Sequence, residues 1–137
     1  MKEKEVKIDL QIVSKKDLRF LYEILKERKP STNISHQKMP TYKEHVNFVL
    51  SKPYSKWYII YFDKNKIGSI YISRQNEIGV FIKKNLKKGL GTEALKILIN
   101  LNPRRQYLAN INPKNKKSIK FFKKNGFKLL QHTYELR

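Results

Sequence analysis

The sequence predicts a single α/β domain over residues 1–137, with a mixed central sheet flanked by helices on both faces. Two observations predict this class. Segments that alternate apolar and polar residues are interspersed with segments of helical spacing, in the order β α α β β β α β α β. The length of 137 residues fits one domain, and 39% hydrophobic residues can fill a core. Three consecutive strands in the middle indicate an antiparallel meander within the sheet.

The first strand and helix follow from their apolar spacing. Residues 5–13 alternate between apolar and polar side chains, which predicts a strand with one buried face. The next segment, up to Lys29, carries leucines and a tyrosine at helical spacing, and Ser14 or Asp17 can cap it. Pro30 ends this helix because proline cannot continue it.

A second helix follows the one sizeable irregular stretch, residues 31–40. Thr41 is its expected N-cap and Glu44 stands at the third helical position, so the two form a capping box. An apolar stripe continues from there to Leu50, and Pro53 ends the helix.

Three strands are expected next. Residues 56–62 are apolar almost throughout, as in a buried strand. Residues 63–66 are typical of a turn, which makes 66–74 the paired strand. In residues 77–83 the apolar side chains fall on alternate positions, with Ile78, Val80 and Ile82 on one face.

The C-terminal part predicts helix, strand, helix and strand. Residues 89–102 have helical apolar spacing, and residues 106–111 are typical of a strand. Residues 115–124 form the next expected helix, which Asn125 and Gly126 end as a left-handed cap. Residues 127–136 are expected to form the last strand.

Composition excludes several classes of protein. The longest apolar runs are about six residues, as in 57–62, whereas a membrane-spanning helix needs about 20. The first five residues have no apolar region behind them, so we expect no secretory signal and a cytoplasmic protein. The absence of cysteine excludes disulfides, a cysteine zinc site and a cysteine nucleophile, and we expect no metal.

The charge is strongly positive and unevenly distributed. The formal net charge is +20, and residues 83–137 hold 15 Lys and Arg against 2 acidic residues. One interpretation is a polyanionic partner, such as RNA, an acidic peptide or a phosphorylated cofactor. The other is the codon bias of an AT-rich genome, because Lys, Asn and Ile contribute 25, 11 and 15 residues. An anion should in any case bind the C-terminal part.

Two glycines flank a single residue where a predicted strand meets a predicted helix. The run is Lys87-Lys88-Gly89-Leu90-Gly91-Thr92. Glycine lets a ligand approach the backbone closely, and the first turn of a helix offers free N–H groups and a partial positive charge. Two lysines add formal charge, so the run predicts a pyrophosphate cradle. The alternative is an ordinary strand–helix turn. Ala94 replaces the third glycine of a dinucleotide fingerprint, and no P-loop lysine follows.

A second motif covers the predicted helix 115–124, and its positions are Asn115, Ser118, Phe122, Lys124, Gly126 and Phe127. Together with the glycine turn one strand earlier, it resembles the GCN5-related N-acetyltransferase (GNAT) superfamily. The resemblance covers roughly residues 5–136 and implies a GNAT-like fold. Two positions depart from the family pattern. Leu86 stands where Gln or Arg is usual, and Phe122 replaces a tyrosine that can protonate a leaving thiolate.

The resemblance implies acetyl-CoA as the donor of an acyl group. Its pyrophosphate would bind backbone N–H groups of the glycine turn, and its pantetheine arm would pair with the end of the strand 77–83. The cofactor-binding residues implied in this way are Phe81, Ile82, Lys87, Lys88, Gly89, Leu90, Gly91, Thr92, Asn115 and Phe122. The Ile82 backbone N–H would donate to the thioester oxygen.

The implied reaction is direct attack of an amine on the thioester, and this amine must lose a proton. Glu77 is the first candidate for the base, followed by His36 and His45; each could instead be a structural residue. Aromatic side chains are candidates for an acceptor groove or for the core, and they are Tyr42, Tyr54, Trp57 and Tyr71.

The acceptor is the least determined part of the prediction. Residues 35–57 are similar to the corresponding region of family members that acetylate amino-sugar nucleotides, so a small-molecule amine is the first expectation. Acetylation of a protein N-terminus, a lysine or an aminoacyl-tRNA is the alternative, and the basic charge would suit RNA or an acidic peptide. A non-catalytic CoA- or nucleic-acid-binding module is the alternative of another class. A homodimer is possible in each case.

Overall fold

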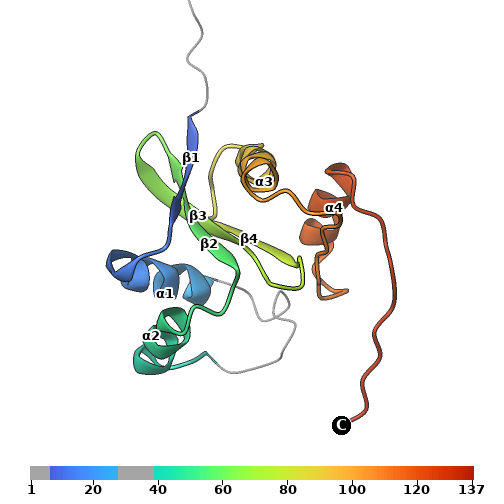
Figure 1. Ribbon diagram of the computed structural model, residues 1–137, viewed down its shortest axis with the longest axis horizontal. Helices are drawn as coiled ribbons and strands as arrows, with labels where there is room; N and C mark the ends of the chain where they lie inside the picture. Colours follow the sequence, from blue (N-terminus) through green and yellow to red (C-terminus); the bar gives the residue numbers. More distant parts are fainter. Residues whose placement is uncertain (1–6, 28–38) are drawn as a thin grey trace, which may run out of the picture.

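The computed structural model describes residues 7–27 and 39–137 (Figure 1). Its four strands form one antiparallel sheet in the order β1-β2-β3-β4. The elements are β1 (Ile8–Ile12), η1 (Lys15–Asp17), α1 (Leu18–Glu27), α2 (Tyr42–Leu50), β2 (Lys56–Phe62), β3 (Asn65–Ile72), β4 (Ile78–Ile82), α3 (Leu90–Leu101) and α4 (Lys116–Lys124). The predicted α/β class is confirmed.

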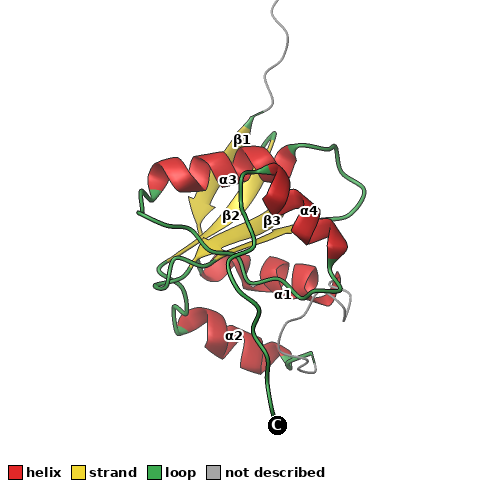
Figure 2. Cartoon of the chain, turned by 90° about the vertical axis from the view of Figure 1, so that its right-hand side faces the viewer, coloured by secondary structure: helices red, strands yellow, loops and turns green. Residues whose placement is uncertain are grey.

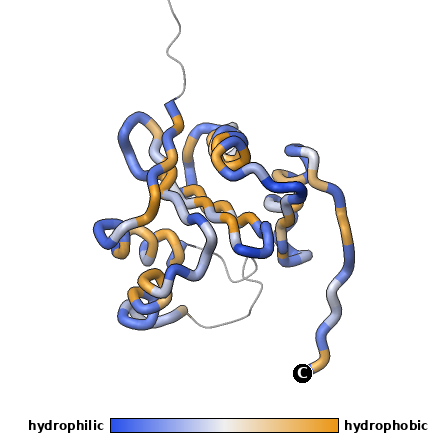
Figure 3. Tube along the Cα trace, in the orientation of Figure 1, coloured by the Kyte–Doolittle hydropathy of each residue, from blue (hydrophilic) through white to orange (hydrophobic). Residues whose placement is uncertain are grey.

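Helices cover both faces of the sheet, as predicted. Figures 1 and 2 show α1 and α2 on one side and α3 on the other, with α4 beside α3. The larger core packs the sheet against α3 and α4, and the smaller core packs it against α1 and α2. Two neighbouring residues of β2 point to opposite faces of the sheet and are both fully buried: Ile60 packs in the larger core and Ile59 in the smaller one. Figure 3 shows mostly hydrophobic colour on α3 and hydrophilic colour on the turns.

Local signals placed the start of α2 correctly. The Glu44 backbone N–H donates to the Thr41 hydroxyl at 3.1 Å, and the Thr41 N–H donates to the Glu44 carboxylate at 2.8 Å. The Thr41 backbone N–H, followed by the Thr41 side chain, stabilises the Glu44 carboxylate and holds its pKa below its ordinary value. The predicted capping box is therefore confirmed.

A bulge between β2 and β3 positions the end of β4. The register shifts between Ile60 and Tyr61, so Ile67 has no partner on β2 and joins the larger core. The Ile67 carbonyl accepts a hydrogen bond from the Lys83 N–H at 2.8 Å, just beyond β4. At Gly68, an added Cβ would lie 1.9 Å from the Phe81 carbonyl oxygen, so only glycine fits. The end of β4 is thus held tightly against β3.

The strand expected at 106–111 is wrong. Only one parallel bridge forms there, between Glu77 and Leu108. In it the Ile78 N–H donates to the Leu108 carbonyl and the Leu108 N–H donates to the Asn76 carbonyl, both at 2.8 Å. Beyond this bridge the chain leaves β4 and runs to α4. Parallel pairing in the sheet is therefore limited to this bridge in the part of the chain that the structure describes.

The strand expected at 127–136 is also wrong, since this segment has no regular structure. Figure 1 shows it running away from α4 along the outside of the molecule. Its large apolar side chains are exposed: Leu129 72%, Leu130 66%, Tyr134 89% and Leu136 100%. A strand needs the backbone hydrogen bonds of a neighbour, and the strand expected before it, 106–111, does not form. Among the described helices, none is long and apolar enough to cross a membrane.

Candidate active site

The outer edge of β4 is open beyond the bridge to Leu108. Backbone groups of alternate strand residues point the same way, and Ile78 donates outward to Leu108. Val80 and Ile82 therefore direct their N–H and C=O groups to the same outer side. No strand of residues 7–27 or 39–137 pairs with them there, because β4 ends the sheet. This edge can accept another extended chain as an added strand.

A cavity of about 240 Å³ lies beside this open edge. It brings together segments that are far apart in the sequence: β4 and the turn before it, the start of α4, and the segment that follows Leu108. The lining residues are Tyr54, Tyr71, Ser73, Glu77, Ile78, Gly79, Val80, Phe81, Asn110, Ile111, Asn115, Ser118 and Phe122.

The Glu77 carboxylate is fixed in this lining by two hydrogen bonds. The Ser73 hydroxyl donates to Oε1 at 3.2 Å, and the Asn110 side-chain amide donates to Oε2. The Ser73 oxygen in turn accepts from the backbone N–H groups of Gln75 at 3.1 Å and Glu77 at 3.0 Å. The turn before β4 therefore holds the serine, and the serine holds the carboxylate. A carboxylate held in this way beside a cavity can accept a proton from a ligand.

Two stacked tyrosines form the aromatic part of the lining. The rings of Tyr71 and Tyr54 are 3.7 Å apart and nearly parallel, and Trp57 packs edge-on against Tyr54 at 4.9 Å. Gly79 allows this arrangement, because an added Cβ would lie 2.2 Å from the Tyr71 ring. Trp57 is thus one contact away from the cavity. Tyr42 is not brought to it, and packs instead on Tyr22 at 5.2 Å.

The predicted anion cradle is a glycine turn that begins α3. Gly89 is the N-cap with φ +92°, and the first helical hydrogen bond runs from the Glu93 N–H to the Gly89 carbonyl at 3.2 Å. The three amides between them, at residues 90–92, have no partner within the helix. Leu90 anchors the turn in the core, being 2% exposed. Lys87 and Lys88 precede it and are exposed.

The turn lies against α4. An added Cβ at Gly91 would lie 3.0 Å from the Phe121 ring, so glycine permits this close packing. The Asn125 side-chain amide donates to the Thr92 hydroxyl at 3.3 Å. The amides of the turn and the open edge of β4 therefore suit a ligand with a diphosphate and an extended arm.

α4 contributes its N-cap asparagine and an aromatic ring to the cavity. The Asn115 side-chain oxygen accepts from the Ser118 N–H at 3.1 Å, and its amide donates to the Ser118 hydroxyl at 3.0 Å. Phe122 is 7% exposed and packs against Phe127 at 5.0 Å between ring centres. Phe122 has no hydroxyl, and Ser118 places one on the same helix face one turn earlier.

The histidines do not reach this cavity in the described residues. His45 is buried on α2 against Tyr22, with 5.2 Å between the ring centres, and does not line the cavity. Burial lowers the pKa of His45, and its hydrogen bond with the Leu18 backbone raises it in part. His36 lies outside the described residues. In the same part of the chain, no group of three or more His, Cys, Asp or Glu could hold a metal ion.

Because the pKa of His45 is lowered on folding, its protonation favours the unfolded chain. Its contribution to stability is complete above its unfolded pKa of about 6.5 and is lost as the pH falls below that value. We expect the melting temperature of the wild type to fall by a few degrees more between pH 7.5 and 5.5 than that of His45→Leu. Thermal unfolding of both proteins across this range tests it. Since the other histidines remain in both proteins, equal slopes would contradict it.

The sequence analysis did not predict a site role for some of the residues that line the cavity. Asn110 and Ile111 were assigned to the end of a strand, and Ser73 had no assigned role. The run Asn110-Ile111-Asn112 is unusually polar for a buried strand, and this signal could have suggested a loop with side-chain hydrogen bonds. Ser118 was noted as a motif position only.

Comparison with known proteins identifies a matching family. The family model described as "Acetyltransferase (GNAT) domain" matches residues 8–128. No curated protein sequence matches the chain.

Several solved structures share the fold. A domain from Methanocaldococcus jannaschii DSM 2661 superposes with a TM-score of 0.79 at 24% identity, covering 96% of this chain and 94% of that one. RimL, the ribosomal L7/L12 alpha-N-protein acetyltransferase, in complex with coenzyme A, gives 0.70 at 17%, covering 93% and 86%. The aminoglycoside N-acetyltransferase AAC(6')-Iy in complex with CoA gives 0.69 at 14%, covering 100% and 98%.

Proposed function

The chain belongs to the GNAT acetyltransferase family, and from that premise we propose that it moves an acetyl group from acetyl-CoA directly to the primary amine of a small molecule. The observation that carries this proposal is the open edge of β4, which runs beside the cavity toward the glycine turn of α3. The extended thioester arm needs an open strand edge, and the diphosphate needs a turn with free amides at the end of that edge.

The donor is held mainly by backbone groups. Residues 90–92 offer their amides to the diphosphate, and Lys87 and Lys88 add charge. The outward N–H and C=O groups of Val80 and Ile82 pair with the amides of the pantetheine arm. Phe122 and Asn115 close the cavity around the thioester end.

The reaction requires a base and a donor to the thioester oxygen. Glu77 accepts the proton of the attacking amine, and Ser73 and Asn110 keep its carboxylate facing the cavity. A backbone N–H on the open edge of β4, at Val80 or Ile82, stabilises the oxyanion. The new N–C bond forms as the C–S bond breaks. The thiolate takes its proton from solvent, since Phe122 cannot donate one.

The acceptor side favours a small amine, with an amino-sugar nucleotide as our first candidate. The stacked pair of Tyr54 and Tyr71 offers flat rings of the kind that pack against sugars and bases. A cavity of about 240 Å³ is large enough for the reacting amine and the thioester end, and the rest of the acceptor would lie outside it. A protein N-terminus is the second candidate, because the fold is shared with RimL, an alpha-N-protein acetyltransferase.

Release of CoA thiol over a panel of amines tests the proposal. We expect kcat/KM for 4-amino-sugar nucleotides to exceed that for dipeptides with free N-termini by about tenfold or more. A reversed order would support the protein N-terminus. CoA should raise the melting temperature of the protein. A raised melting temperature without turnover of any amine would indicate a binding module, and no change with CoA would contradict the donor site itself.

A further inference from the structure

α4 presents two stripes of residues, and the proposed function uses only one of them. Asn115, Ser118 and Phe122 line the cavity beside β4. The residues that follow Asn115 and Ser118 in the chain, Lys116 and Ile119, belong to the second stripe. Successive helix residues are rotated by about 100°, so the two stripes face different directions.

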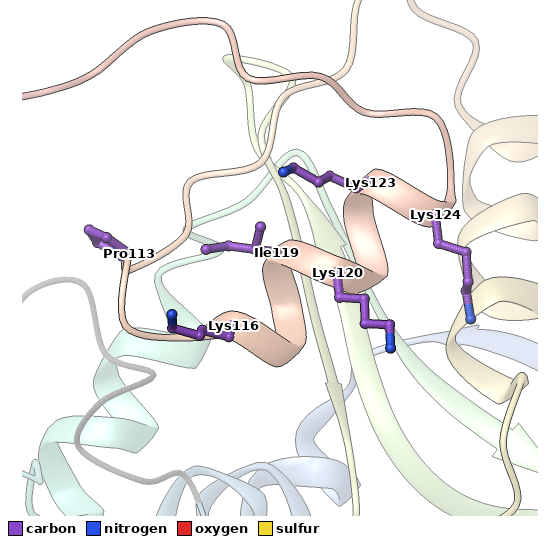
Figure 4. A pocket seen from close by; sticks show the side chains of 6 residues that line it. All are labelled: Pro113, Lys116, Ile119, Lys120, Lys123 and Lys124. Carbon is purple, nitrogen blue, oxygen red and sulfur yellow. The ribbon is translucent and has the colours of Figure 1, made fainter.

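The second stripe borders a broad pocket of about 640 Å³, which we call the lysine pocket. Figure 4 shows its lining of Pro113, Lys116, Ile119, Lys120, Lys123 and Lys124. Its four lysines are all exposed, and α4 contains no acidic residue. The ion pairs found among the described residues use none of them. Four positive charges therefore stand on one helix face without a countercharge.

We propose that the lysine pocket binds a polynucleotide strand through its phosphodiester backbone, which goes beyond the proposed acetyl transfer. Lys116, Lys120 and Lys124 are four residues apart, so about 6 Å of helix rise separates each from the next. That spacing sets a row of cations along a strand that carries one phosphate per nucleotide.

The chemistry of the lining favours nucleic acid over an acidic peptide. The lining side chains are lysines, one isoleucine and one proline, so they offer donors and apolar surface but no acceptor. A phosphodiester strand needs only donors, and it repeats one anionic acceptor per nucleotide, as a regular row of lysines requires. The lining has no arginine, the side chain that most often reads guanine, which indicates contact with phosphates and little dependence on base sequence.

Fluorescence anisotropy with a labelled 20-nucleotide single-stranded RNA of mixed sequence tests the proposal. We expect the triple variant K116Q/K120Q/K124Q to bind at least about tenfold more weakly at low salt. The slope of log affinity against log salt should be smaller by about 2, as the loss of three phosphate contacts requires. Glutamine keeps a good helix propensity, so α4 should remain folded, and circular dichroism checks this.

The matched control is K15Q/K16Q/K43Q, which removes the same charge from exposed positions in η1 and α2, on the other side of the sheet. We expect it to bind within twofold of the wild type. An equal loss in both variants would overturn the proposal, since net charge alone would then explain the binding. Equal competition by polyglutamate of matched charge would also overturn it. Saturating CoA should leave the RNA affinity unchanged, and displacement of the RNA by CoA would assign these lysines to the donor.

Discussion

The variant Glu77→Gln should lower kcat at least about 100-fold and leave the affinity for CoA unchanged. Glutamine has the shape of glutamate and keeps one acceptor oxygen for Ser73 or Asn110, but it cannot take the proton of the attacking amine. The shape of the site is therefore kept while the proton acceptor is removed. Steady-state release of CoA thiol measures kcat, and calorimetric titration measures CoA binding.

The control for this prediction is Glu23→Gln. Glu23 is half exposed on α1, where it pairs with Arg19 and Lys26, and it lies on the other side of the sheet from α4. We expect this variant to keep the kcat of the wild type. If Glu77→Gln also kept it, Glu77 would be a structural carboxylate and the base would have to be sought elsewhere.

The parts of the fold that could be predicted depend on local signals. The capping box of Thr41 and Glu44 uses residues three positions apart, and the left-handed turn at Gly89 uses one glycine at a strand–helix junction. The strand 56–62 could be read from its continuous apolar run. Each of these signals is complete within a few residues, so a single sequence suffices to find it.

The two strand predictions that were wrong concern segments whose structure depends on pairing with a neighbour, and no local signal indicates that pairing. Residues 106–111 and 127–136 have typical strand composition, but a strand forms only where a neighbour supplies backbone hydrogen bonds. The first segment leaves β4 after Leu108, and that departure is what opens the edge and the cavity. The family resemblance implied a pantetheine arm at this edge, but the alternation of apolar residues alone could not indicate that the sheet opens there.

The residues of the candidate site also fall into those that local signals could predict and those that depend on the tertiary fold. Glu77 and Asn115 line the cavity because each flanks the start of an element whose boundary was predicted well, and Phe122 lines it because it lies on the same helix face as Asn115. Tyr42 and His45 do not, because their direction depends on how α2 packs against α1. Ser73 and Asn110 were missed because a hydrogen-bond network is set by the tertiary fold and has no sequence period.

The glycine turn provides the other prediction with a large effect, because the chain contains a matched pair of glycines. Gly89 has φ +92° and Gly126 has φ +93°, and an added Cβ at either position would meet no atom within 4 Å. Replacing either by alanine should therefore introduce the same strain, about 1 kcal/mol, with no steric clash. We expect Gly89→Ala and Gly126→Ala to lower the melting temperature by similar amounts.

The affinity for CoA should separate the two variants. Gly89 begins α3, where the first amides have no partner within the helix, whereas Gly126 follows the C-terminal end of α4, where its N–H donates to the Lys123 carbonyl at 3.0 Å. If alanine relaxes toward negative φ at Gly89, the amides of residues 90–92 turn away from the diphosphate. We expect Gly89→Ala to bind CoA about tenfold or more weakly in calorimetric titration, and Gly126→Ala to bind within twofold of the wild type. Unchanged binding by Gly89→Ala would show that the diphosphate does not depend on this turn. An equal loss in both variants would trace the effect to stability alone.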